Sequence, residues 1–133
     1  MRVALDTNVI VSALATRGLC ADLFQAVLAE HERLVGETVL AELRLVLSRK
    51  LRLPDATVDA LQAFVRRQAI IVNAEPSSMP GRLGAADASV LAQAAAGAAD
   101  VLVTGDQDLL TAPDPPVKTV SPRQLWDLIR RVT

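Results

Sequence analysis

Two short runs of apolar residues constrain the fold of this chain more than any other feature of its sequence. The runs VAL at 3–5 and VLV at 101–103 show no alternation of apolar and polar residues. Strands of this kind are typical of parallel sheets that are covered by helices on both faces. Asp6 directly follows the first run, and Asp106 follows shortly after the second. The sequence therefore predicts two buried strands whose carboxyl ends each lead to a carboxylate.

The remaining segments alternate between predicted helices and strands. Apolar residues at helical spacing predict helices over 8–14, 20–31, 38–50, 54–65, 87–98 and from 122 onward. Further strands are predicted over 33–35, 69–73 and 117–120, with a loop over 75–84 and a turn over 112–116. This order favours a three-layer α/β/α fold with a central, mostly parallel sheet. No repeat or linker divides the chain, so we expect a single domain over 1–133.

Polar residues mark the starts of two of these helices. Thr7 or Asn8 is predicted to cap the first helix, because short polar side chains accept hydrogen bonds from its first backbone N–H groups. Ser121 is predicted to cap the last helix, with Pro122 at its first position.

The composition is that of an ordinary globular domain. Hydrophobic residues make up 51% of the 133 residues and charged residues 22%, which is not typical of disorder. Cys20 is the only cysteine, so no internal disulfide can form. No apolar run reaches the roughly 18 residues of a membrane span, and Asp6 interrupts what would be the apolar core of a signal peptide. We therefore expect a cytoplasmic protein with no membrane partner.

The net charge of −1 at first argues against a nucleic-acid partner, but it says nothing of how the charges are distributed. If four acids gather in one pocket, the 14 basic residues face only 11 other acidic residues. Basic residues cluster over 44–52 and at 66–67, and such clusters either hold phosphates or form a solvated helix face. Aromatic residues make up only 2% of the chain, so stacking on bases cannot be the main contact with a nucleic acid.

Two further acids fall on helix faces that are otherwise apolar. Glu42 lies three residues after Val39, at the edge of a predicted apolar stripe. Asp87 precedes Val90 and Leu91 by three and four residues, so it shares their core-facing side. Each acid also has a simpler explanation, because Glu42 could reach water at the edge of the stripe and Asp87 could cap its helix.

Asp6 and Asp106 have simple explanations too, as a helix cap and as part of a turn. Four carboxylates at one edge of a sheet nevertheless favour a bound cation, because like charges close together raise one another's pKa and a divalent cation removes that penalty. Hard oxygen ligands suit Mg²⁺ or Mn²⁺, which can activate water for the hydrolysis of a phosphodiester. His31 is the only histidine and falls on a polar helix face, so a zinc site or a Ser/His/Asp triad is poorly supplied.

The same residues resemble the motifs of a known family. DTNVI after the first strand, the Glu of VLAEL, DASVLAQA before a strand, and VTGDQDLL are similar, in this order, to the motifs of the PIN domain. The resemblance covers essentially the whole chain, which looks like the PIN-domain toxins of bacterial toxin–antitoxin systems, the VapC-like ribonucleases. Members of the family often carry one or two more acids just before the third motif, where this chain has LGAAD and Asp87 is the only acid.

The resemblance implies a metal-dependent endoribonuclease that hydrolyses RNA with one or two Mg²⁺ or Mn²⁺ ions. The implied catalytic and metal-binding acids are Asp6, Glu42, Asp87 and Asp106. The implied supporting residues are Asn8, Thr104 and Asp108. The implied partners are an RNA substrate, an antitoxin protein and a second copy of the chain in a homodimer.

One alternative is a non-catalytic PIN scaffold that binds RNA or a protein. Another is an aspartyl phosphohydrolase of a different α/β class, which usually needs D-x-D where this chain has Asn8 at the second acidic position.

Overall fold

A computed structural model of the protein describes residues 1–75 and 84–132. Its strands are β1 (Arg2–Leu5), β2 (Glu32–Gly36), β3 (Ile70–Val72), β4 (Val101–Val103) and β5 (Lys118–Val120). Its α-helices are α1 (Thr7–Ala15), α2 (Leu19–Glu30), α3 (Glu37–Leu45), α4 (Asp55–Gln68), α5 (Ala85–Ala96), α6 (Gln107–Leu110) and α7 (Pro122–Val132). A π-helical turn, η1 (Val46–Lys50), continues α3.

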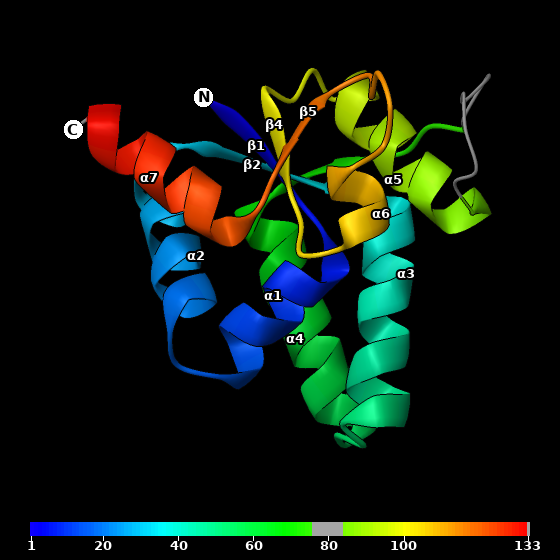
Figure 1. The fold of residues 1–133 in the computed structure, drawn as a ribbon. Helices are drawn as coiled ribbons and strands as arrows, with labels where there is room; N and C mark the ends of the chain where they lie inside the picture. Colours follow the sequence, from blue (N-terminus) through cyan, green and yellow to red (C-terminus); the bar gives the residue numbers. More distant parts are fainter. Residues whose placement is uncertain (76–83, 133) are drawn as a thin grey trace.

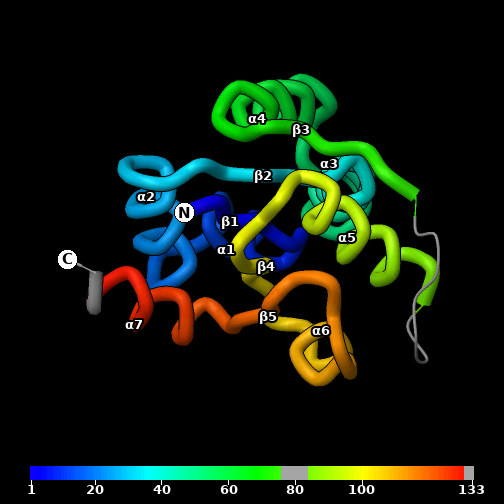
Figure 2. The backbone as a smooth tube through the Cα atoms, turned by 90° about the horizontal axis from the view of Figure 1, so that it is seen from above, coloured from blue at the N-terminus to red at the C-terminus, as the bar shows by residue number. Residues whose placement is uncertain are grey.

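The strands form a five-stranded sheet in the order β3-β2-β1-β4-β5, and every neighbouring pair is parallel. Helices cover both faces of the sheet, which confirms the predicted three-layer α/β/α fold (Figure 1). Seen from above, α2 and α7 lie on one side of the sheet and α5 lies on the other, while α4 runs beside the edge strand β3 (Figure 2). Every strand therefore ends at the same edge of the sheet, which we call the carboxyl edge.

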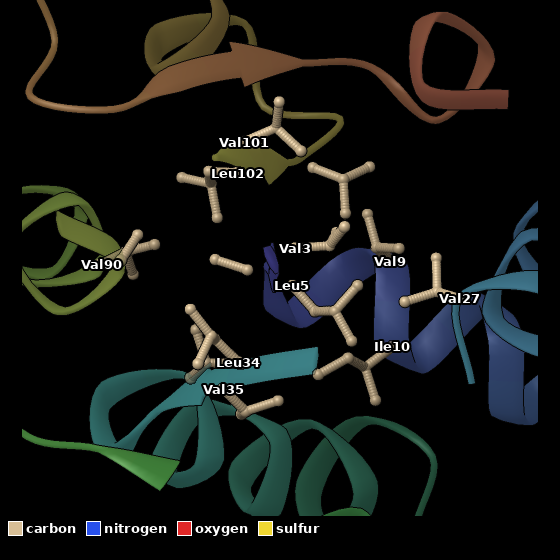
Figure 3. Close-up of a cluster of buried hydrophobic side chains, with 14 of the residues drawn as sticks. Val3, Leu5, Val9, Ile10, Val27, Leu34, Val35, Val90, Val101 and Leu102 are labelled. Atoms are coloured by element: carbon tan, nitrogen blue, oxygen red, sulfur yellow. The ribbon is translucent and has the colours of Figure 1, made fainter. Parts of the chain in front are cut away.

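The central strands β1 and β4 are buried on both faces, as their apolar runs predict. Leu5 of β1 pairs with Val103 of β4, and both side chains are almost fully buried. In the core, Val90 of α5 lies on one side of the cluster and Val27 of α2 on the opposite side (Figure 3). Because β1 and β4 are in register, the residues that follow them leave the sheet side by side.

The first helix is capped by a different residue from the one predicted. Asp6, rather than Thr7 or Asn8, is the N-cap of α1, and its Oδ1 accepts a hydrogen bond of 2.8 Å from the backbone N–H of Thr7. Asp6 has the extended backbone of an N-cap, with φ −85° and ψ 160°, because it still continues strand β1. The simpler explanation of Asp6 as a helix cap is thus confirmed, although it does not exclude a second role for this carboxylate.

Two other elements differ from the sequence prediction. The helix predicted over 38–50 ends at Leu45 and continues as η1, where the backbone N–H of Leu51 donates to the carbonyl of Val46 at 3.0 Å. This bond has the i to i+5 spacing of a π-helix, and Leu47 is the buried residue of η1. Helix α6 was not predicted, because a helix of four residues is too short to show a period. Most of the loop predicted over 75–84 lies outside the described residues.

The described helices include none that could by itself span a membrane. Helices α1 and α2 together have the length and composition for a span, but the chain bends by 103° between them.

The N-terminus of α7 provides a test of local stability. The backbone N–H of Gln124 donates to Ser121 Oγ at 3.1 Å, and the N–H of Ser121 donates to Gln124 Oε1 at 2.8 Å. This reciprocal pair confirms Ser121 as the predicted cap.

We expect Ser121→Ala to lower the free energy of unfolding by about 1 kcal/mol in urea denaturation. The matched control is Ser48→Ala, because the Ser48 hydroxyl donates to the carbonyl of Arg44 within a helix and contributes little. Equal losses in both variants would contradict the capping role.

Candidate metal centre

Asp6 is held rigidly at the carboxyl edge. It is only 6% exposed, and its backbone N–H donates to the carbonyl of Val103 at 3.1 Å. Besides the bond from Thr7 to Oδ1, its Oδ2 accepts a hydrogen bond of 2.6 Å from the hydroxyl of Thr104. Thr104 is fully buried after β4, so both oxygens of the Asp6 carboxylate have fixed partners. The supporting role predicted for Thr104 therefore has a structural basis in this contact.

Glu42 is tied to the same corner of the molecule through Thr7. It lies in α3 beside the buried Leu43, and its Oε2 accepts a hydrogen bond of 3.0 Å from the Thr7 hydroxyl. Thr7 thus binds Asp6 with its backbone N–H and Glu42 with its side chain. The Glu42 side chain points to the start of α1, so it is not simply a boundary residue that reaches water.

Asp106 stands where β4 passes into α6. It is the N-cap of α6, and its Oδ1 accepts a hydrogen bond of 2.9 Å from the backbone N–H of Asp108. The N–H of Asp106 donates to Thr104 Oγ1 at 3.0 Å, so the hydroxyl that donates to Asp6 also holds the backbone of Asp106. Asp108 is exposed in the first turn of α6.

The charges of all of these acids act on Asp87. Partial burial raises the pKa of Asp87, and the negative charges of Asp106, Asp6, Asp108 and Glu42 raise it further, in that order. The helix-cap explanation of Asp87 is wrong, because Gly84 is the N-cap of α5, and no side chain of the described residues caps this helix. The structure thus gathers carboxylates from four separate parts of the chain. We call this group the acidic cluster: Asp6, Glu42, Asp87, Asp106 and Asp108.

Two residues considered in the sequence analysis have no hydrogen bond to the acidic cluster among the described residues. Asn8 is exposed on α1, and in the described part of the chain no hydrogen bond joins its side chain to the acidic cluster. His31 lies at the opposite, amino edge of the sheet, where its Nδ1 is 3.1 Å from the amino group of Met1. Partial burial and this positive charge lower the pKa of His31. His31 therefore lies at the other end of the sheet from the acidic cluster.

The side chains of the acidic cluster have the chemistry that Mg²⁺ and Mn²⁺ prefer, since all of them end in carboxylate oxygens. Among the described residues, however, no three Asp, Glu, His or Cys side chains converge closely enough to hold one ion directly. Mg²⁺ usually binds one or two carboxylates and keeps several waters. The cluster therefore fits a hydrated ion, and the choice of ligands among its members stays a prediction.

Sequence reasoning missed two residues that shape this site. Thr7 was expected to cap α1, but it joins Asp6 to Glu42. Gln93 is a buried amide of α5, and its only signal in the sequence is that it interrupts the run of alanines over 92–96. Both act through contacts between distant parts of the chain, which a local pattern does not reveal.

Comparison with known proteins identifies the family of this chain. The family model of the PIN domain matches residues 2–108. The protein belongs to the PIN domain family. The matched range contains the whole acidic cluster. No curated protein matches the sequence significantly.

Several solved structures have the fold of this PIN domain. VapBC2 from Rickettsia felis, bound to a promoter DNA fragment, aligns with a TM-score of 0.69 and 17% identity over 91% of this chain and 98% of the other. FitAcB from Neisseria gonorrhoeae aligns with a TM-score of 0.63 and 19% identity over 91% and 98%. A PilT N-terminus domain protein from the archaeon Sulfolobus solfataricus aligns with a TM-score of 0.57 and 14% identity over 97% and 93%. At these identities the similarity establishes the fold.

Proposed function

We propose that this PIN domain is a metal-dependent endoribonuclease that hydrolyses RNA phosphodiester bonds in the cytoplasm. The observation that carries the proposal is the acidic cluster, in which the charges of four other carboxylates act on Asp87. Ligands of open parallel sheets bind beyond the carboxyl ends of the strands, and this is where Asp6 and Asp106 lie. Because like charges repel at short range, such a cluster favours a divalent cation.

The proposed chemistry gives each residue a defined task. A bound Mg²⁺ or Mn²⁺ would supply an activated water and stabilise the charge on the displaced oxygen. Asp6 would bind the metal with a carboxylate that Thr7 and Thr104 already orient. Glu42, Asp87 and Asp106 would bind it directly or through water. Because hydrogen bonds already hold the carboxylates of Asp6, Glu42 and Asp106, little reorganisation of these three would be needed on binding.

Basic residues would hold the RNA backbone. Arg44 and Arg66 are engaged elsewhere, since exposed ion pairs join Arg44 to Asp59 at 2.9 Å and Arg66 to Glu37 at 3.5 Å. For Arg44 and Arg66 the structure therefore favours a place on a solvated helix face over a contact with phosphate. The exposed basic residues of the segment 49–52, at the end of η1 and just after it, are the proposed phosphate contacts.

We further propose that the protein is the toxin of a toxin–antitoxin pair, bound by an antitoxin and assembled as a homodimer. The support is the fold shared with VapBC2 and FitAcB over 91% of this chain. Co-expression with the product of the adjacent open reading frame tests this part of the proposal. A stable complex of both proteins, together with a dimer mass by light scattering, is the expected result.

A second candidate is a non-catalytic PIN scaffold that binds RNA or a protein partner. The observation that favours it is the lack of three converging ligand side chains among the described residues. Metal binding and RNA cleavage separate the two candidates, because only the nuclease requires both.

Manganese is expected to stabilise the folded protein and to switch on cleavage. A ligand that binds only the folded state stabilises it by about 2.7 kcal/mol at 100 times its Kd, which is roughly 10 °C for a domain of this size. We expect such a rise in Tm when manganese is added to protein stripped with EDTA, and cleavage of a mixed RNA pool that EDTA stops. Calcium is the control, because it prefers more ligands and longer bonds.

The outcomes of this experiment are distinct. A rise in Tm without cleavage would favour the scaffold. No change in Tm and no cleavage would contradict a metal centre in the acidic cluster.

A further inference from the structure

Gln93 is the most deeply buried amide side chain in the described part of this PIN domain, and it lies outside the acidic cluster. It is only 3% exposed, yet its side chain has three hydrogen bonds. Its Oε1 accepts from the backbone N–H of Thr38 at 3.0 Å, and its Nε2 donates to Thr38 Oγ1 at 2.9 Å and to the carbonyl of Ala74 at 3.3 Å. A buried amide with this many partners fixes the elements that it joins.

The amide of Gln93 acts as the missing cap of α3. Gly36 is the N-cap of this helix and provides no side chain, so the first N–H groups of α3 need a partner from elsewhere. Gln93 supplies that partner from α5. Glycine at position 36 makes room for it, because a Cβ there would lie 2.0 Å from Gln93 Oε1. The backbone of Gly36, with φ −74° and ψ 155°, suits any residue, so space rather than conformation requires glycine.

The two helices that Gln93 joins each carry one acid of the cluster. Glu42 lies one turn after Thr38 on α3, and Asp87 lies in the first turn of α5, the helix of Gln93. Since a helix is rigid over such lengths, the bonds between Gln93 and Thr38 restrain the position of α3, with Glu42, relative to α5, with Asp87. The third bond, to Ala74, ties the same point to the chain after β3.

We propose that Gln93 is a positioning residue of the candidate metal centre, which holds α3 against α5 so that Glu42 and Asp87 can serve the same ion. This inference rests on the proposed metal-dependent function. Groups that orient metal ligands without touching the ion typically change metal affinity when they are removed.

The chain offers a matched control in Gln62. Its Nε2 donates to the carbonyl of Leu40 at 2.7 Å, so it also ties an amide to α3. Gln62 comes from α4, which carries no member of the acidic cluster. Its removal therefore loosens α3 without changing the link between Glu42 and Asp87.

The experiment compares the parent with Gln93→Met and Gln62→Met, which replace each amide by a side chain of similar volume. Unfolding in EDTA measures stability, and calorimetric titration with Mn²⁺ measures affinity at a temperature where all three proteins are folded. Both variants are expected to lose stability, but only Gln93→Met is expected to bind Mn²⁺ more weakly, by about 10-fold, the lower end of the range for groups that contact a ligand directly. Thr38→Val removes one of the three hydrogen bonds of Gln93, so it is expected to weaken Mn²⁺ binding less than Gln93→Met does. If Gln93→Met does not fold, Thr38→Val tests the positioning role in its place.

Failure of this inference differs from failure of the proposed function. If the parent itself does not bind Mn²⁺, both are overturned. If the parent binds Mn²⁺ and Gln93→Met or Thr38→Val binds it as tightly as Gln62→Met does, the positioning role alone is overturned.

Discussion

Asp6→Asn is expected to abolish manganese-dependent RNA cleavage and to remove most of the manganese-induced rise in Tm. Asparagine has nearly the same shape and is as good an N-cap as aspartate, so α1 should keep its start. The change removes the negative charge of the Asp6 carboxylate, which hydrogen bonds from Thr7 and Thr104 orient at the carboxyl edge. Loss of a group that only orients a metal ligand typically costs 10- to 100-fold in affinity or activity, so loss of a direct ligand should exceed about 100-fold.

The assays are cleavage of the mixed RNA pool and thermal melting with and without manganese. Asp22→Asn is the control, because Asp22 is exposed in the first turn of α2, away from the acidic cluster. The Asp6→Asn protein should still bind RNA through its basic residues, with an affinity that falls steeply as salt rises. If Asp6→Asn gained as much Tm from manganese as the parent does, Asp6 would not be a metal ligand.

Asp87→Asn is expected to change stability in opposite directions with and without metal. Burial and the charges of the other acids raise the pKa of Asp87, which means that the folded protein disfavours its ionised form. In EDTA at pH 7 the variant should therefore be as stable as the parent or more stable, although it loses the favourable interaction of an anion with the start of α5. With manganese present, the parent should become more stable than the variant, because the parent offers the ion one more carboxylate, that of Asp87. Urea denaturation of both proteins under both conditions measures the reversal.

The raised pKa also gives this difference a pH dependence. A group whose folded-state pKa lies above its unfolded value contributes stability at low pH, and this contribution is lost as the pH rises through the folded-state pKa. In EDTA the advantage of Asp87→Asn should therefore be largest near neutral pH and should disappear in acid, where Asp87 is protonated in both states. A variant that is less stable than the parent in EDTA, yet gains equally from manganese, would contradict the acidic cluster as described.

The sequence by itself was sufficient to predict the central sheet and the edge at which the acids gather. A strand buried on both faces has no polar positions, so VAL at 3–5 and VLV at 101–103 identify β1 and β4 without any knowledge of the fold. Parallel strands end at the same edge, which is why Asp6 and Asp106 could be placed together. The helical positions of Glu42 and Asp87 pointed to the same region, because spacing along a helix determines which face a residue occupies.

Only the tertiary structure decided how those acids are held. The bond from Thr7 to Glu42 joins residues 35 positions apart, that from Thr104 to Asp6 joins residues 98 apart, and those from Gln93 to Thr38 join residues 55 apart. Local periodicity carries no information about such pairs, because they depend on how α3 and α5 pack beside the sheet. The same reason explains why Thr7 was first taken for a cap: its hydroxyl has a distant partner that only the folded chain brings within 3.0 Å.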